Sequence, residues 1–212
     1  MEIQSLQPKT SRTQARVART RDRLKQAALN CFSAKTVDAT TIDEITQRAE
    51  VAKGTLYQHF SDKEEIVVIL VDEAVDHLIA MIRAYDPAPA DLEGMLEHLL
   101  EAHYQFSENC REEFLVLFQG KLLLKLQSET LDELEEPYLR YLQEIEQQVA
   151  RYLSPSISPM KVRRLACAVA GFVFGFWSFA MIGMDEQDRD ESIVPLKRVF
   201  VKGLCAFLGR QV

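Results

Sequence analysis

The segment from Thr40 to Lys63 constrains the fold of this 212-residue chain more than any other part of the sequence. Its pattern predicts two short helices joined by a tight turn, with a third helix beginning directly afterwards. Thr41 and Glu44 have the spacing of a capping box, which predicts the start of the first of these helices. Ser61 is followed three residues later by Glu64, and this second capping box predicts the start of the third helix.

Each of the two short helices has one apolar face. The first is expected to bury Ile42, Ile45 and Ala49, and the second, over residues 52–58, to bury Leu56. The side chains left facing outward are those of Lys53, Thr55, Tyr57 and His59. Crossed helices with such side chains are typical of a helix-turn-helix, in which one helix enters the major groove of DNA and its neighbours contact phosphates.

This segment resembles the DNA-binding domain of the TetR family of bacterial transcriptional regulators. The resemblance rests on the run Lys53-Gly54-Thr55-Leu56-Tyr57-Gln58-His59-Phe60 with Lys63-Glu64 after it, and it extends back through Phe32, Ala28, Ala27 and Leu24 to Arg21. It covers about residues 15–70, roughly a quarter of the chain. The sequence departs from the family at Glu50 and near Lys35 and Thr36, where the family usually has glycine. These turns are therefore expected to be made by residues that adopt positive φ less readily.

The resemblance implies an all-α protein, in which an N-terminal three-helix DNA-binding domain is joined to a C-terminal helical bundle for ligand binding and dimerisation. It implies DNA contacts from seven residues: Thr41, Lys53, Gly54, Thr55, Tyr57, His59 and Lys63. We expect Tyr57 and Lys63 to contact phosphates, and Lys53, Gly54 and Thr55 to lie against base edges.

The charges are divided unevenly along the chain. Residues 1–60 carry ten Lys or Arg and six Asp or Glu, whereas the rest of the chain has a net charge of −11. Six basic residues surround the start of the first long helix: Arg12, Arg16, Arg19, Arg21, Arg23 and Lys25. They form either a solvated basic face or a surface for phosphates and the minor groove, and the adjacent helix-turn-helix favours the second interpretation. The division predicts that only the N-terminal part meets a polyanion.

The rest of the sequence predicts long helices, since eight Gly and seven Pro leave little room for many turns. We divide the chain into a polar arm at 1–12, a DNA-binding domain at 13–61 and a helical domain at 62–212. Helices are expected at about 62–85, from Asp91, at 111–126, from Pro137, from Pro159 with Ser158 as its cap, and at 192–208. Residues 128–136 and 185–191 are acidic and are expected to be connections.

Residues 165–184 contain no charged side chain, which suits either a membrane span or a helix buried in protein. The amphipathic helices on both sides need a core to cover, and this favours the buried helix. The family resemblance implies that the last two helices form a four-helix interface with a second copy. The candidate interface residues are Phe172, Gly175, Phe176, Phe179 and Leu204.

The resemblance also implies an effector pocket inside the helical domain. Candidate lining residues are His103, Tyr104, Phe118, Tyr141 and Cys167. Because the domain has many aromatic residues and its basic residues mostly fall near helix ends, the effector is expected to be small, mostly apolar, and neutral or weakly cationic.

The sequence predicts no cofactor, no metal site and no catalytic site. The four cysteines have no CxxC spacing, and His98 and His103 diverge by about 140° around a helix. The N-terminus has no apolar signal-peptide core, which predicts a cytoplasmic protein. The favoured hypothesis is a homodimeric one-component transcriptional repressor that binds a palindromic operator on double-stranded DNA and does not bind membranes. A lipid-binding or membrane-associated helical protein and an enzyme with an unrecognised site are alternatives, but neither accounts for residues 53–63.

Overall fold

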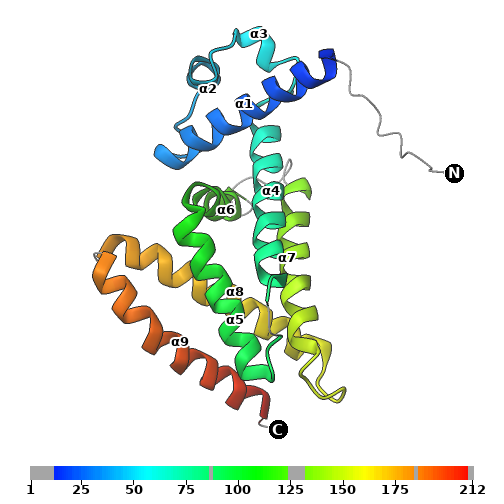
Figure 1. The fold of residues 1–212 in the computed structure, drawn as a ribbon, viewed down its shortest axis with the longest axis vertical. Helices are drawn as coiled ribbons and strands as arrows, with labels where there is room; N and C mark the ends of the chain where they lie inside the picture. The colour runs from blue at the N-terminus through cyan, green and yellow to red at the C-terminus, as the bar shows by residue number, and fades with distance from the viewer. Residues whose placement is uncertain (1–11, 86–87, 124–131, 184–185, 210–212) are drawn as a thin grey trace, which may run out of the picture. The chain divides into compact units, whose positions relative to one another are not determined.

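The computed structural model describes residues 12–85, 88–123, 132–183 and 186–209, and these residues form nine helices and no strand (Figure 1). The prediction of an all-α fold is therefore confirmed. The chain divides into two compact units, Met1–Leu70 and Val71–Val212. Of the arm predicted at 1–12, residues 1–11 lie outside the described residues, and Arg12 begins the first helix.

The first unit contains α1 (Arg12–Ala34), α2 (Ile42–Arg48), α3 (Lys53–Leu56) and the start of α4 (Lys63–Arg83). Its core is formed by side chains that are almost fully buried: Leu24, Ala28, Phe32, Ile45, Leu56, Phe60 and Ile66. Val17, near the start of α1, is an apolar residue that is 51% exposed. Helix α1 is about 35 Å long, whereas α2 and α3 are short and leave the first turns of α1 uncovered.

One of the two predicted capping boxes is confirmed and the other is displaced. The Thr41 hydroxyl accepts from the Glu44 N–H at 3.3 Å, and Glu44 Oε2 accepts from the Thr41 N–H at 2.9 Å. At α4 the cap is Asp62, which accepts from the Glu65 N–H at 2.8 Å, while Glu65 Oε2 accepts from the Ser61 N–H at 2.6 Å. The prediction of a Ser61–Glu64 box is wrong by one residue, because α4 begins at Lys63 and its third position is Glu65.

The turns of the first unit have the backbone that the missing glycines predicted. Glu50 has a φ of 53° and Thr36 has a φ of 134°, and both values favour glycine. Arg23 donates to the carbonyl oxygen of Ala49 beside Glu50, and Thr40 Oγ1 donates to the Thr36 carbonyl oxygen at 2.7 Å. These hydrogen bonds offset part of the strain at each turn.

The second unit contains the rest of α4, α5 (Leu92–Asn109), α6 (Arg111–Leu123), α7 (Asp132–Ala150), α8 (Pro159–Gly183) and α9 (Glu186–Gly209). Helix α5 contacts α6, α7, α8 and α9, so the core of this unit surrounds it (Figure 1). The predicted caps of two helices are present. Asp91 accepts from the Gly94 N–H at 2.8 Å at the start of α5, and Ser158 Oγ accepts from the Lys161 N–H at 3.3 Å at the start of α8.

Two helices begin earlier than the sequence analysis predicted. Helix α7 begins at Asp132 and α9 at Glu186, so Pro137 and Pro195 lie inside helices. Acidic residues are favoured in the first turn of a helix by its dipole, and acidity alone was therefore a poor sign of a connection. The predicted end of α6 at Leu126, residues 128–131 and Asp185 lie outside the described residues.

Ion pairs join α4 and α7 along their length. The Arg83 guanidinium donates to both carboxylate oxygens of Glu144, at 3.0 and 2.5 Å. Arg140 donates to Asp72 at 2.7 Å and to Asp76 at 2.9 Å. Among the described residues, no helix has both the length and the apolar character needed to span a membrane.

Candidate nucleic-acid interface

The outward face of α3 is set by one buried side chain. Leu56 is fully buried, and this turns Lys53, Gly54 and Tyr57 toward solvent, with Tyr57 52% exposed. Thr55 and His59 are partly exposed. The helix is shorter than the predicted range of 52–58, because a turn through residues 57–59 follows Leu56.

Gly54 has no structural reason to be glycine. A Cβ built on it meets no atom within 4 Å, and no glycine among the described residues has a positive φ. A glycine inside a helix costs about 1 kcal/mol relative to alanine. A close approach from outside the molecule is a physical reason to accept that cost, since the backbone at the start of α3 is left bare.

Lys53 forms an ion pair across the turn with Asp43 of α2, with Nζ and Oδ1 2.8 Å apart. The hydrogen bond to Asp43 raises the pKa of Lys53. Both side chains are largely exposed, so the pair is weak and a phosphate or base edge can replace the carboxylate. Sequence analysis missed Asp43, because no local pattern links it to a residue ten positions later.

Thr41 and Lys63 have structural contacts of their own. The Thr41 hydroxyl caps α2, and Glu44 beside it has its pKa lowered to about 2 by Lys35 and Thr41. Lys63 Nζ donates to the carbonyl oxygens of Val37 at 2.8 Å and Thr40 at 3.1 Å. The lysine therefore ties the start of α4 to the α1–α2 loop, and one of its three donors remains for a phosphate.

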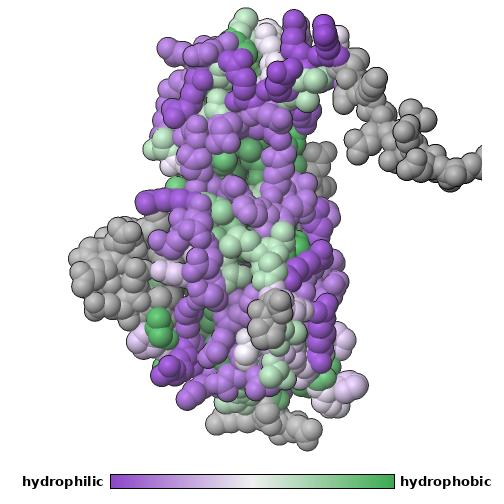
Figure 2. Space-filling view, in the orientation of Figure 1, coloured by the Kyte–Doolittle hydropathy of each residue, from purple (hydrophilic) through white to green (hydrophobic). Residues whose placement is uncertain are grey.

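The arginines of α1 fall into two groups. Arg21 lies over the ring of Phe60, 4.8 Å from its centre, and Arg23 bonds to the turn at Ala49. Arg12, Arg16 and Arg19 are exposed on the first turns of α1. Figure 2 shows a largely hydrophilic surface over α1 to α3 on the face that it presents. Exposed guanidinium groups such as those of Arg12, Arg16 and Arg19 suit contact with phosphates.

In the second unit the structure brings together two of the predicted ligand-binding residues. His103 Nδ1 donates to the Leu99 carbonyl oxygen at 2.5 Å, and the Tyr141 hydroxyl donates to His103 Nε2 at 2.6 Å. Burial lowers the pKa of His103 to about 4 and raises the pKa of Tyr141. The two side chains are therefore neutral at pH 7 and bonded to each other inside the bundle.

The other predicted ligand-binding residues lie in different surroundings. Tyr104 is partly buried, with Lys197 Nζ of α9 5.2 Å from the centre of its ring. Phe118 is partly exposed on α6. Cys167 is exposed on α8, although its thiol is near enough to contribute to the raised pKa of Tyr141. The five residues do not share one environment.

The predicted interface residues lie on α8 and α9 with different exposure. Phe179 is 77% exposed, whereas Leu204 is buried within the chain. Phe172, Gly175 and Phe176 are partly exposed, and the ring of Phe172 stacks on that of Phe200 of α9, with centres 4.2 Å apart.

Each of these helices also carries an outward stripe at four-residue spacing. The α8 stripe is Gly171, Gly175 and Phe179, and the α9 stripe is Val199, Gly203 and Phe207. A Cβ built on any of the three glycines meets nothing within 4 Å. Val199 is 70% exposed and Phe207 is 45% exposed. Both stripes thus combine exposed apolar side chains with bare backbone.

Comparison with known proteins supports the resemblance of the first unit to the TetR family. Residues 24–68 match the family described as bacterial regulatory proteins, tetR family. The chain is similar to the HTH-type transcriptional activator FasR of Mycolicibacterium smegmatis, with 32% identity over 100 residues, 47% of this chain and 46% of FasR. It is also similar to the HTH-type transcriptional regulator TcmR of Streptomyces glaucescens, with 31% identity over 144 residues, 66% of this chain and 62% of TcmR. The chain thus spans less than two thirds of the length of either relative.

The whole fold has solved counterparts. The transcriptional regulator FadR of Bacillus subtilis, solved in complex with stearoyl-CoA, matches with a TM-score of 0.68 and 17% identity. The match covers 86% of this chain and 96% of that protein. At this identity the likeness establishes a shared fold.

Proposed function

Since the chain belongs to the TetR family of bacterial regulatory proteins, we propose that it is a one-component transcriptional regulator that binds an operator on double-stranded DNA. The observation that carries this proposal is the bare start of α3, where Gly54 stands between two side chains able to bond base edges, Lys53 and Thr55. In the proposed complex these residues face the major groove, while Tyr57 and Lys63 contact phosphates. Thr41 and His59 flank them.

The test is selection of genomic DNA fragments by the purified protein, followed by titration of the selected duplex with Gly54→Leu. The variant should bind the operator at least about 100-fold more weakly, because the leucine blocks close approach. Its thermal midpoint should not fall, since a Cβ at this exposed position meets no atom within 4 Å. Ala34→Leu, at the exposed end of α1, is the matched control and should bind normally. Unchanged operator affinity in Gly54→Leu would refute this orientation of α3, and failure to select any duplex would refute the proposal.

We further propose that the protein is a homodimer and that its operator is palindromic. The support is the pair of stripes on α8 and α9, where exposed Phe179, Val199 and Phe207 accompany glycines at which an added Cβ meets nothing within 4 Å. Burying such side chains against a second copy removes apolar surface from water. A two-fold dimer presents two copies of α3, and two half-sites related by the same symmetry follow. Sedimentation of the wild type as a monomer would remove the basis of this proposal.

Repression is the direction of control that we propose. A dimer seated on an operator within its own promoter excludes polymerase, so deletion of the gene should raise expression of a reporter driven by that promoter. FasR is named as an activator, and a fall in reporter expression on deletion would assign activation to this protein too. A protein acting on the chromosome works in the cytoplasm, which is the location we propose. The names of the relatives are those of regulators and agree with the prediction that the chain is not an enzyme.

The effector that we propose is a small, mostly apolar molecule without a strong negative charge, bound in the second unit. The inner polar pair, His103 and Tyr141, is neutral. Four basic residues of the second unit are already engaged: Arg83 by Glu144, Arg140 by Asp72 and Asp76, Arg151 by Tyr85 and Lys197 by Glu101. An anion bound beside any of these four would have to displace its present partner.

Release of the operator by a panel of compounds tests the chemical class of the effector. The panel should contain neutral hydrophobic compounds, a long-chain fatty acid, stearoyl-CoA and an uncharged stearoyl ester. FadR was solved with stearoyl-CoA, which joins a long apolar chain to an anionic head group. We expect release by neutral members of the panel. Release by stearoyl-CoA alone, with no response to the uncharged ester, would place an anionic group in the site and refute this effector class.

A further inference from the structure

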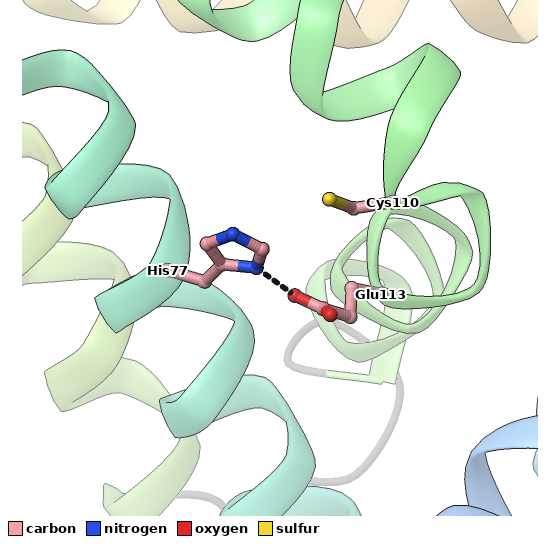
Figure 3. Close-up of side chains that lie close together, drawn as sticks. All are labelled: His77, Cys110 and Glu113. Carbon is pink, nitrogen blue, oxygen red and sulfur yellow. Dashed lines mark hydrogen bonds and ion pairs between the residues drawn. The ribbon is translucent and has the colours of Figure 1, made fainter. Parts of the chain in front are cut away.

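Three side chains from separate parts of the second unit converge beside α4. His77 comes from α4, Cys110 from the junction of α5 and α6, and Glu113 from the first turn of α6 (Figure 3). One ligand atom from each, a ring nitrogen, the thiol sulfur and a carboxylate oxygen, lies within 4.8 Å of the other two. Figure 3 shows the thiol and the carboxylate both directed toward the imidazole ring.

The backbone around these groups is fixed, while the groups themselves can be reached from solvent. The Cys110 N–H donates to the Phe106 carbonyl oxygen, and the Cys110 carbonyl oxygen accepts from the Phe114 N–H, both at 2.9 Å. His77 packs edge-on against the ring of Phe106, with ring centres 5.7 Å apart. The side chains of His77 and Glu113 are 45% and 31% exposed. An ion arriving from solvent therefore meets donors that these hydrogen bonds and this packing hold in place.

We infer that His77, Cys110 and Glu113 form a binding site for a divalent ion of the zinc class. Thiolate, imidazole and carboxylate are the three protein donors that zinc uses, with water completing a tetrahedron. Sulfur and nitrogen donors select against magnesium and calcium, which take oxygen ligands. Zinc bond lengths require ligand atoms roughly 3.3–3.8 Å apart, so a movement of about 1 Å by the side chains completes the site.

The donor set of the cluster favours a cation. It combines a carboxylate, a thiol and an imidazole whose ligand atoms all lie within 4.8 Å of one another. When a divalent ion binds, the Cys110 proton leaves to solvent and the sulfur bonds to the ion as a thiolate. The ion also replaces the hydrogen bond between His77 Nδ1 and Glu113 Oε2, now 2.8 Å long.

The sequence analysis predicted no metal site because it considered only neighbours on one helix. His98 and His103 are engaged elsewhere, His98 Nε2 with the Ile82 carbonyl oxygen at 2.8 Å and His103 with Tyr141. The cluster joins residue 77 to residues 110 and 113, so the fold alone assembles it. The inference goes beyond the proposed regulation of transcription and does not depend on it.

The test uses the full-length protein, reduced and stripped of metal, with Co²⁺ as the spectroscopic probe and Zn²⁺ as competitor. The wild type should bind one Co²⁺ per chain, with thiolate-to-cobalt charge-transfer absorption and visible bands of a tetrahedral site, and Zn²⁺ should bleach both. In Cys110→Ser the charge-transfer absorption should vanish. In His77→Gln and in Glu113→Gln the ion should bind at least about tenfold more weakly.

Cys205→Ser, which removes a partly buried thiol from α9, is the matched control and should titrate like the wild type. Zinc should raise the thermal midpoint of the wild type and of this control, but not that of Cys110→Ser. Absence of the charge-transfer band from the wild type would overturn the proposal and leave an ordinary His77–Glu113 ion pair. Retention of the band in Cys110→Ser would overturn it as well.

Discussion

The outward face of α3 and the outward stripes of α8 and α9 share one feature, helix glycines that leave the backbone bare. Each contains helix glycines whose added Cβ would meet nothing within 4 Å. Around Gly54 the neighbours are Lys53, Thr55 and Tyr57, whereas beside the glycines of the stripes they are Phe179, Val199 and Phe207. Bare backbone allows a close approach in both places, and the neighbouring side chains decide what approaches. Polar donors suit phosphates and base edges, and apolar groups suit a second copy of the chain.

Gly120 shows that a helix glycine can have the opposite meaning. A Cβ there would lie 2.8 Å from Val71 Cγ2 of α4 and 2.8 Å from Tyr138 Oη of α7. The Tyr138 hydroxyl donates to the Leu117 carbonyl oxygen at 2.5 Å, so it is not free to retreat. This glycine lets three helices of the second unit meet. Gly120 is therefore an inner glycine, whereas Gly54 and the glycines of the stripes are outer ones.

The largest effect is expected for Phe179→Glu, which introduces a charge on the α8 stripe. If the stripe faces a second copy, each subunit buries an unpaired carboxylate at a cost of about 3–5 kcal/mol. The dimer dissociation constant, measured by sedimentation equilibrium, should then rise by at least about 100-fold. The fold of each subunit should be retained, because Phe179 is 77% exposed within it.

Leu139→Glu is the matched control for that variant. Leu139 is also an exposed apolar residue, at 41%, but it lies on α7 outside both stripes. It should leave the dimer intact. A dimer that survives Phe179→Glu and dissociates in Leu139→Glu would reverse the assignment of the apolar face.

A smaller effect is expected for Gly120→Ala. The extra methyl group overpacks the meeting point of α4, α6 and α7 and should lower the free energy of unfolding by about 1–3 kcal/mol. Gly54→Ala is the matched control and should raise it by up to about 1 kcal/mol, because alanine favours helix and the site is open. Thermal melts of the two variants measure both values. A shift of the same sign in both would remove the distinction between inner and outer glycines.

Whether a feature could be predicted depends on how far apart in the sequence the contacting residues lie. The Thr41–Glu44 box and the Ser158 cap are local, and both were predicted correctly. The turn at Glu50 was recognised only as one where the usual glycine is missing, and the structure shows that Glu50 itself adopts the positive φ. The cap of α4 was predicted at Ser61 and lies at Asp62, an error of one residue between two residue types that both cap helices. Local chemistry explains why the family was recognised from residues 53–64.

Contacts between distant residues were not predicted. The Lys53–Asp43 pair, the bond between Tyr141 and His103, and the approach of Val71 to Gly120 each depend on how helices pack. An apolar face indicates which side of a helix turns inward, but many partners are compatible with one such face. For the same reason, the proximity of His77 to Cys110 and Glu113 could not be predicted from the sequence.

The last pair of variants should separate the roles of Lys63 and Tyr57. Lys63 Nζ donates to two carbonyl oxygens of the α1–α2 loop, so Lys63→Ala should lower the free energy of unfolding by about 1–3 kcal/mol. Tyr57 is 52% exposed, and Tyr57→Phe should leave stability unchanged. Both variants should weaken binding to operator and unrelated duplexes alike, because phosphate contacts carry no sequence information.

Titrations of DNA binding at several salt concentrations distinguish the two variants further. The salt dependence should fall by about one unit in Lys63→Ala, which removes a cation from phosphate, and should not change in Tyr57→Phe. If Lys63→Ala destabilised the protein but kept the full salt dependence, the lysine would serve the fold alone, and phosphate contact would have to be assigned to the exposed arginines of α1.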